Sequence, residues 1–133
     1  MIKAYVAGII NLYEGEDIEL RYSIYEDENL LAKEFLITKY KKPAVVGAVA
    51  LHKLLKALEQ FKDKEITIFM NEAALYEFIK GTGWTKNKDV QNIVGEIQYE
   101  LSKFNQLVIK DVGTDHKELE KWNEVLQAKE SQI

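Results

Sequence analysis

Apolar and polar residues alternate along the first third of the chain. In IELRYSIY at 18–25, every second residue is Ile, Leu or Tyr, and the residues between them are mostly polar. Alternation with a period of two is typical of a strand that buries one face. Residues 4–12 and 31–39 have a similar strand-like composition, and the polar segment EDEN at 26–29 favours a turn. The pattern predicts three strands joined by short turns in an antiparallel meander.

After residue 42 the spacing of apolar residues changes to three and four. Pro43, the only proline, suits the first turn of a helix, and the apolar positions from Val46 to Phe61 repeat with a helical period. The short apolar run EITIFM at 65–70 predicts a central strand that is covered on both faces. A short helix over 72–80 then ends at Gly81, because glycine commonly terminates helices.

The last part of the chain adds two helices and a strand. The segments predicted there are a loop at 81–88, a helix at 89–104, a strand at 106–112 and a helix at 116–129 capped by Thr114 or Asp115. The full order is β-β-β-α-β-α-α-β-α. This order predicts one α/β domain over 1–133, with a five-stranded mixed sheet of three antiparallel and then two parallel strands, and helices on both faces.

Composition narrows the chemistry that this domain can perform. The 133 residues include no cysteine, which excludes disulfides, thiolate metal sites and cysteine nucleophiles. Two histidines, His52 and His116, are too few for a histidine metal site, and we expect both to be structural. The net charge of −4 does not fit a globally basic nucleic-acid binder, so such contacts would need a local basic patch. Without an apolar run of about 18 residues or a signal peptide, the chain is predicted to be cytoplasmic, with no membrane contact.

The order of elements resembles the ribonuclease H fold, and several segments resemble that family over nearly the whole chain. They are VVGAVALHKLLKALEQF, ITIFMNEAALYEFIKGTGW, WTKNKDVQNIVGEI and VIKDVGTDHKELEKWNEVL. The resemblance implies an enzyme that cleaves the RNA strand of an RNA–DNA hybrid with two divalent ions, usually Mg²⁺. In the family, four carboxylates hold these ions.

None of the four positions that correspond to those carboxylates is acidic in this chain. Aligned through Gly8, the resemblance places them at Ala7, at Ala48 or Ala50, at Asn71 and at Asn123. Two adjacent dications without compensating anions would repel each other strongly. We therefore expect a pseudoenzyme with no metal and no cofactor. Loss at all four positions suggests natural divergence, as in a phage or another mobile element.

Asn71 and its neighbour Glu72 have alternative interpretations. Asn71 precedes a predicted helix and is a favourable N-cap residue. Glu72 is a possible replacement acid, although one step along a strand reverses the side-chain direction. Asn123 is either a boundary polar residue or a hydrogen-bonding partner of Asn71. A divergent nuclease with relocated acids would use Glu72, Asp111 and Asp115.

Basic residues beside an aromatic residue form the candidate nucleic-acid site. The candidates are Lys80, Trp84, Lys86 and Lys88, in the region that grips the hybrid backbone in the resembled family. A second basic cluster, at 39–42, precedes Pro43. The leading hypothesis is an inactive ribonuclease H-like module that binds nucleic acid, as RNA–DNA hybrid or duplex, or protein. The alternatives are the divergent nuclease and a structural oligomer with no nucleic-acid role.

Overall fold

The computed structural model describes residues 1–10, 17–39 and 41–127. The chain begins with three antiparallel strands, β1 (Ile2–Ile9), β2 (Ile18–Glu26) and β3 (Asn29–Thr38). A tight turn joins β2 to β3, and Asp27 adopts a positive φ of 55° in it. The predicted meander is therefore confirmed. The end of the first predicted strand, at 11–12, lies outside the described residues.

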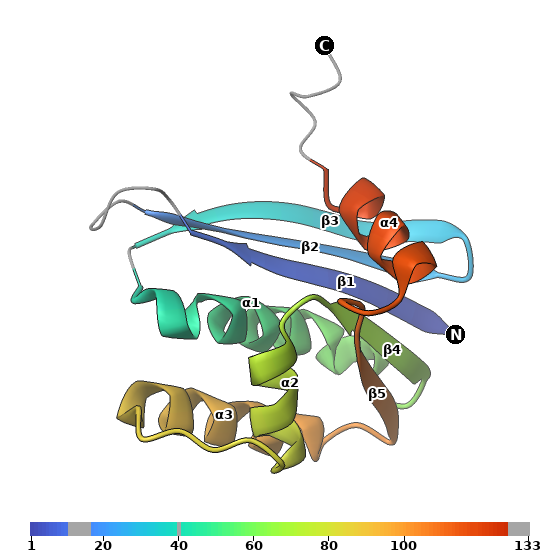
Figure 1. Ribbon diagram of the computed structural model, residues 1–133. Coiled ribbons are helices and arrows are strands. Elements are labelled where there is room, and N and C mark those ends of the chain that lie inside the picture. The colour runs from blue at the N-terminus through green and yellow to red at the C-terminus, as the bar shows by residue number, and fades with distance from the viewer. Residues whose placement is uncertain (11–16, 40, 128–133) are drawn as a thin grey trace.

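Helices and parallel strands follow in the predicted order. They are α1 (Pro43–Leu58), the 3-10 turn η1 (Glu59–Phe61), β4 (Glu65–Met70), α2 (Ala73–Lys80), α3 (Lys88–Leu101), β5 (Gln106–Asp111) and α4 (His116–Val125). The sheet order is β3-β2-β1-β4-β5, in which β4 runs parallel to both β1 and β5. Figure 1 shows α1, α2 and α3 on one side of the sheet and α4 on the other. This is the predicted five-stranded mixed sheet with helices on both faces.

Each face of the sheet has its own apolar core. The larger core packs β-strand side chains against α1 and α3, and the residues Ile18, Leu20 and Ile24 of β2 contribute to it with 1–2% exposure. A smaller core lies under α4, where the Tyr5 and Phe69 rings stack at 4.9 Å. Because β4 contributes to both cores, the prediction of a strand covered on two faces is confirmed.

Local capping signals account for three of the helix ends. Asn87 accepts hydrogen bonds from the backbone N–H groups of Asp89 and Val90 at the start of α3, and Asp115 accepts one from Glu118 at the start of α4. Gly81, with φ of 81°, ends α2 as expected. The expectation that Asn71 caps α2 is wrong.

The residue at the N-cap position of α2 is Glu72, and its side chain forms no capping hydrogen bond. The chain therefore stays extended one residue further than the sequence suggested. Within the described residues, no helix has the length and apolar character needed to cross a bilayer.

Candidate functional site

The carboxyl ends of β1 and β4 lie side by side at the same end of the sheet. Tyr5 of β1 lies opposite Phe69 of β4, so Ala7 and Asn71, each two residues further along, lie at the same end. The helix α4 crosses here, and its Trp122 donates a hydrogen bond from Nε1 to the backbone oxygen of Val6 at 3.0 Å. Ala7 packs against the core beneath α4. The structure thus brings Ala7, Asn71 and α4 together, with Asn123 exposed beside Trp122.

The helix α1 presents Gly47 to this region. Ala48 and Ala50 are 3% and 1% exposed and belong to the larger core. A Cβ atom on residue 47 would lie 1.7 Å from Oε2 of Glu72. The Glu72 carboxylate therefore occupies the space that a side chain at position 47 would fill.

Acidic and amide groups gather where β4 and β5 end. The pKa of Glu72 is raised, first by burial of its carboxylate and then by the nearby charge of Asp111. A Cβ atom on Gly113 would lie 3.1 Å from Oδ1 of Asn71 and 3.6 Å from either carboxylate oxygen of Asp111. Asn71 and Asp111 therefore both lie beside Gly113, and Glu72 lies near Asp111, whereas the Asp115 carboxylate is engaged in capping α4.

Neither histidine lies with Glu72 and Asp111 in a cluster that could bind a metal ion. His116 is the exposed first residue of α4, and His52 is half-buried on α1, where it lines a cavity of about 490 Å³ with Lys56 and Glu96. Across the described ranges, no three His, Asp or Glu side chains are placed to hold a metal ion together.

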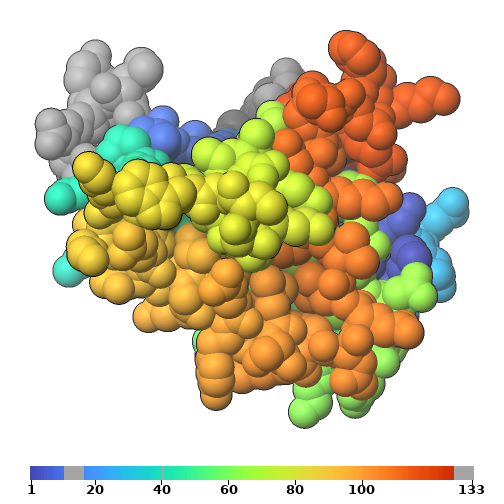
Figure 2. Space-filling model, turned by 60° about the horizontal axis from the view of Figure 1, so that its bottom comes forward, coloured from blue at the N-terminus to red at the C-terminus, as the bar shows by residue number. Residues whose placement is uncertain are grey.

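The segment 81–87, which we call the Trp84 loop, holds its aromatic ring out from the surface. Trp84 is 76% exposed, and the ammonium of Lys86 lies 6.0 Å from its ring centroid. The loop is fixed at both ends. The backbone N–H groups of Thr82 and Gly83 each donate to the Glu77 oxygen at 3.0 Å, and Gln91 Nε2 donates to the backbone oxygen of Thr85 at 2.7 Å. Figure 2 shows this segment in yellow across the front of the molecule.

The four basic-site candidates do not form one cluster. Trp84 lines a cavity of about 210 Å³ between α2 and α3. Lys80 lines a different cavity, and its ammonium lies 5.3 Å from the ring centroid of Tyr76. Lys88 is exposed as the first residue of α3. Of these three lysines, Lys86 is thus the one whose ammonium lies near the Trp84 ring.

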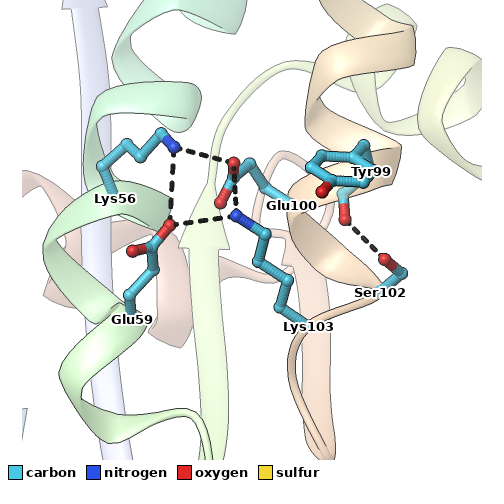
Figure 3. A network of polar contacts seen from close by, with 6 residues as sticks. All are labelled: Lys56, Glu59, Tyr99, Glu100, Ser102 and Lys103. Atoms are coloured by element: carbon cyan, nitrogen blue, oxygen red, sulfur yellow. Dashed lines mark hydrogen bonds and ion pairs between the residues drawn. The ribbon is translucent and has the colours of Figure 1, made fainter.

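Ion pairs around the buried Glu100 join α1 to α3, and the sequence patterns did not predict them. Glu100 is 3% exposed, and its Oε1 lies 2.8 Å from Lys56 Nζ and 3.1 Å from Lys103 Nζ. Glu59 completes the network, as Figure 3 shows, with contacts of 3.5 Å to Lys56 and 3.4 Å to Lys103. Hydrogen bonding from Lys56, opposed by desolvation and supported by Lys103, lowers the pKa of Glu100 to about 2. The available signal was a charged residue on the apolar stripe of α3, between Ile97 and Leu101.

Comparison with known proteins identifies the architecture. No protein-family model and no curated protein sequence matches the chain. Ribonuclease H1 from the halophilic archaeon Halobacterium salinarum NRC-1 superposes with a TM-score of 0.77 at 16% identity, over 88% of this chain and 89% of that one. The fold is that of ribonuclease H.

Two further ribonuclease H structures have similar scores. The N-terminal ribonuclease H domain of Rv2228c from Mycobacterium tuberculosis gives a TM-score of 0.74 at 13% identity, over 95% of this chain and 98% of that one. LC11-RNase H1, solved in complex with an RNA/DNA hybrid, gives 0.75 at 17% identity, over 87% and 88%. The ribonuclease H-like fold predicted from the order of elements is confirmed.

Proposed function

We propose that this ribonuclease H-like domain binds nucleic acid through the Trp84 loop without cutting it. The observation that carries the proposal is the 76% exposure of Trp84 on a loop fixed at both ends, with Lys86 beside the ring. A large exposed aromatic ring next to a cation provides a stacking surface for a base and a charge for the backbone phosphate. The hybrid bound by the similar LC11-RNase H1 supports a nucleic-acid role for this architecture.

The side chains available to bind metal ions support the proposal that the domain does not cut nucleic acid. At the end of the sheet they are one amide and two carboxylates, those of Asn71, Glu72 and Asp111. Two adjacent Mg²⁺ ions carry four positive charges, and two carboxylates leave half of that charge uncompensated. This donor set therefore does not fit a two-ion centre, and we derive no hydrolytic step from it.

Binding is tested by fluorescence anisotropy with a fluorescein-labelled RNA–DNA hybrid over a range of salt concentrations. Trp84→Ala should weaken binding by about 5-fold or more, because stacking contributes about 1–3 kcal/mol per base. The double variant Lys86→Ala, Lys88→Ala should reduce the slope of log affinity against log salt by about 2. The matched control Lys53→Ala, Lys62→Ala removes the same charge from exposed positions outside the loop and should change the slope less.

Two results would contradict this proposal. One is hybrid binding that Trp84→Ala leaves unchanged; the other is an equal loss in the control and loop double variants, which would indicate general electrostatic attraction. Absence of salt-sensitive binding to either hybrid or duplex would favour the structural-oligomer alternative.

A second function, a divergent nuclease, is favoured by one observation. The carboxylate of Glu72 is turned towards α1 at Gly47 and lies close enough to Asp111 for their charges to interact. A cleavage assay on labelled hybrid with Mg²⁺ or Mn²⁺ tests it. Metal-dependent cutting that is lost in Glu72→Gln and in Asp111→Asn, but kept in Glu96→Gln, would replace the non-cutting proposal.

A further inference from the structure

A cavity of about 550 Å³ lies beside the edge strand β5. Its lining includes four consecutive residues of this strand, from Leu107 to Lys110. Successive side chains of a strand point to opposite faces of the sheet, so a cavity on one face would not meet all four. The cavity therefore runs along the outer edge of β5. In the described part of the chain, β5 has a neighbouring strand, β4, on one side only.

The wall of the cavity opposite the strand is apolar. Tyr76 and Ile79 of α2, Leu101 at the end of α3 and Phe104 in the following turn form most of it, with Asn105 as a polar neighbour. Val108 of β5, which is 56% exposed, adds an apolar surface at the rim. Figure 2 shows the surface of α2 and its following loop, in yellow, directly above the orange surface of α3 and β5. The space is large enough for a bulky side chain.

The charges on the lining are all of one sign. Lys80 at the end of α2 and Lys110 on β5 are the charged residues among those that line this cavity. Both are exposed, but they lie on different faces of the sheet, since the Lys110 ammonium is 6.0 Å from the centroid of the Phe69 ring in the core beneath α4. A negatively charged segment along the edge of β5 would therefore meet one lysine on each side of the strand while an apolar group entered the cavity. The site therefore combines the edge of β5 that is unpaired among the described residues, a largely apolar cavity and two lysines.

We propose that β5 accepts an extended acidic peptide from a partner protein as a sixth strand. The peptide backbone would pair with the free edge of β5, one apolar side chain would fill the cavity, and carboxylates would face Lys80 and Lys110. Main-chain pairing supplies affinity in this mode of recognition, and side chains at alternate positions supply specificity. A second copy of the chain fits less well, because a symmetric β5–β5 pair would bring both copies' Lys80 and Lys110 to one interface.

The probe is a short fluorescein-labelled peptide in which Asp alternates with Val and a central Phe. Fluorescence anisotropy should detect its binding, and a control peptide with Lys in place of each Asp should bind at least about tenfold more weakly, a difference of about 1.4 kcal/mol. Lys110→Glu should cause a loss of similar size, whereas Lys53→Glu, an equal charge change on α1, should have little effect. Circular dichroism confirms that each variant is folded, and Lys80→Glu provides a second charge reversal.

Hydrogen exchange distinguishes strand addition from simple charge attraction. Bound peptide should slow amide exchange in β5 relative to β3, the opposite edge of the sheet. Equal binding of the two peptides, unprotected β5 amides, or no binding up to about 1 mM would overturn the proposal. A dimer in sedimentation experiments would also overturn the proposal if the dimer persists in Lys110→Glu and prevents peptide binding. The double variant Lys86→Ala, Lys88→Ala should alter hybrid binding and leave peptide binding unchanged. Failure of the peptide proposal is therefore distinguishable from failure of the nucleic-acid proposal.

Discussion

At the scale of single residues, two glycines of the site differ in what surrounds them. The three atoms nearest to a Cβ atom on Gly47 would all belong to the Glu72 carboxylate, the far end of a flexible side chain. A Cβ atom on Gly8 would lie 2.7 Å from the backbone oxygen of Val46 and 2.9 Å from its carbonyl carbon. The first contact can be relieved by rotation of a side chain, but the second would require β1 and α1 to move apart.

Alanine substitutions should therefore have opposite effects at these two glycines. Gly47→Ala should be neutral or stabilise the protein by up to about 1 kcal/mol, because alanine favours the helix while Glu72 rotates into solvent. Gly8→Ala should destabilise it by about 1–3 kcal/mol through overpacking. Urea denaturation measures both changes, and NMR titration should show the pKa of Glu72 falling in Gly47→Ala. A large loss of stability in Gly47→Ala would mean that Glu72 cannot leave its position.

The sequence predicted part of this site and missed the rest for a physical reason. Alternation along an extended chain predicted that Asn71 and Glu72 point in different directions, and Glu72 has the extended angles of φ −152° and ψ 90° that this prediction requires. The same extended backbone explains why Asn71 does not cap α2. The proximity of Glu72 to Gly47 depends on how α1 packs on the sheet, which no local pattern encodes.

At the scale of elements, the α1–α3 contact depends on the charge of Glu100. Its pKa is lowered from 4.5 to about 2, mainly by hydrogen bonding from Lys56 and then Lys103. The folded state thus binds this proton more weakly than the unfolded chain. The stabilising contribution is complete above about pH 4.5 and is lost as the pH falls towards 2.

Glu100→Gln should therefore lower the free energy of unfolding by about 2 kcal/mol at pH 7, because two hydrogen bonds to a charged group are weakened. The difference from the wild-type protein should narrow as the pH falls from 4.5 towards 2. Urea denaturation at several pH values measures it. Glu96→Gln, an exposed change on the same helix, should stay within about 0.5 kcal/mol. A difference that does not change with pH would assign the effect to packing.

Element boundaries illustrate the limit of periodicity. The apolar stripe of α3 continues to Phe104, which predicted a helix to that residue, yet the helix ends at Leu101. Phe104 is 9% exposed and reaches the core from a turn in which its N–H donates to the Leu101 oxygen at 3.1 Å. Phe104 fits the helical spacing because its side chain is buried in the same core as the apolar stripe of α3, although residue 104 is not helical. The strand at 18–25 was easier to predict, because its two-residue alternation follows from the sheet itself, and β2 extends over Ile18–Glu26.

At the scale of the whole molecule, the two apolar cores share one sheet. Trp122 belongs to the α4 side, whereas α1 and α3 lie on the other side and supply most of the helical circular dichroism signal. In a Trp84→Phe background, Trp122 is the remaining tryptophan of the chain. Its fluorescence and the far-ultraviolet circular dichroism should give the same urea midpoint, because loss of the sheet removes both cores together.

This experiment also tests the prediction of one domain over 1–133. Trp84→Phe itself should change stability by no more than about 0.5 kcal/mol, since the ring is exposed. A fluorescence transition that precedes the circular dichroism transition would show that α4 and its core unfold separately. In that case the sheet would remain folded against α1 and α3.

The shared space of Gly47 and Glu72 also makes the position of one side chain depend on which residue occupies the other site. The inward position of the Glu72 carboxylate is incompatible with any side chain at position 47, since even a Cβ atom would lie 1.7 Å from Oε2. A glutamate that appeared at position 72 before position 47 became glycine would have pointed into solvent. Whichever residue arose first, the Glu72 carboxylate can take its present position only when residue 47 is glycine.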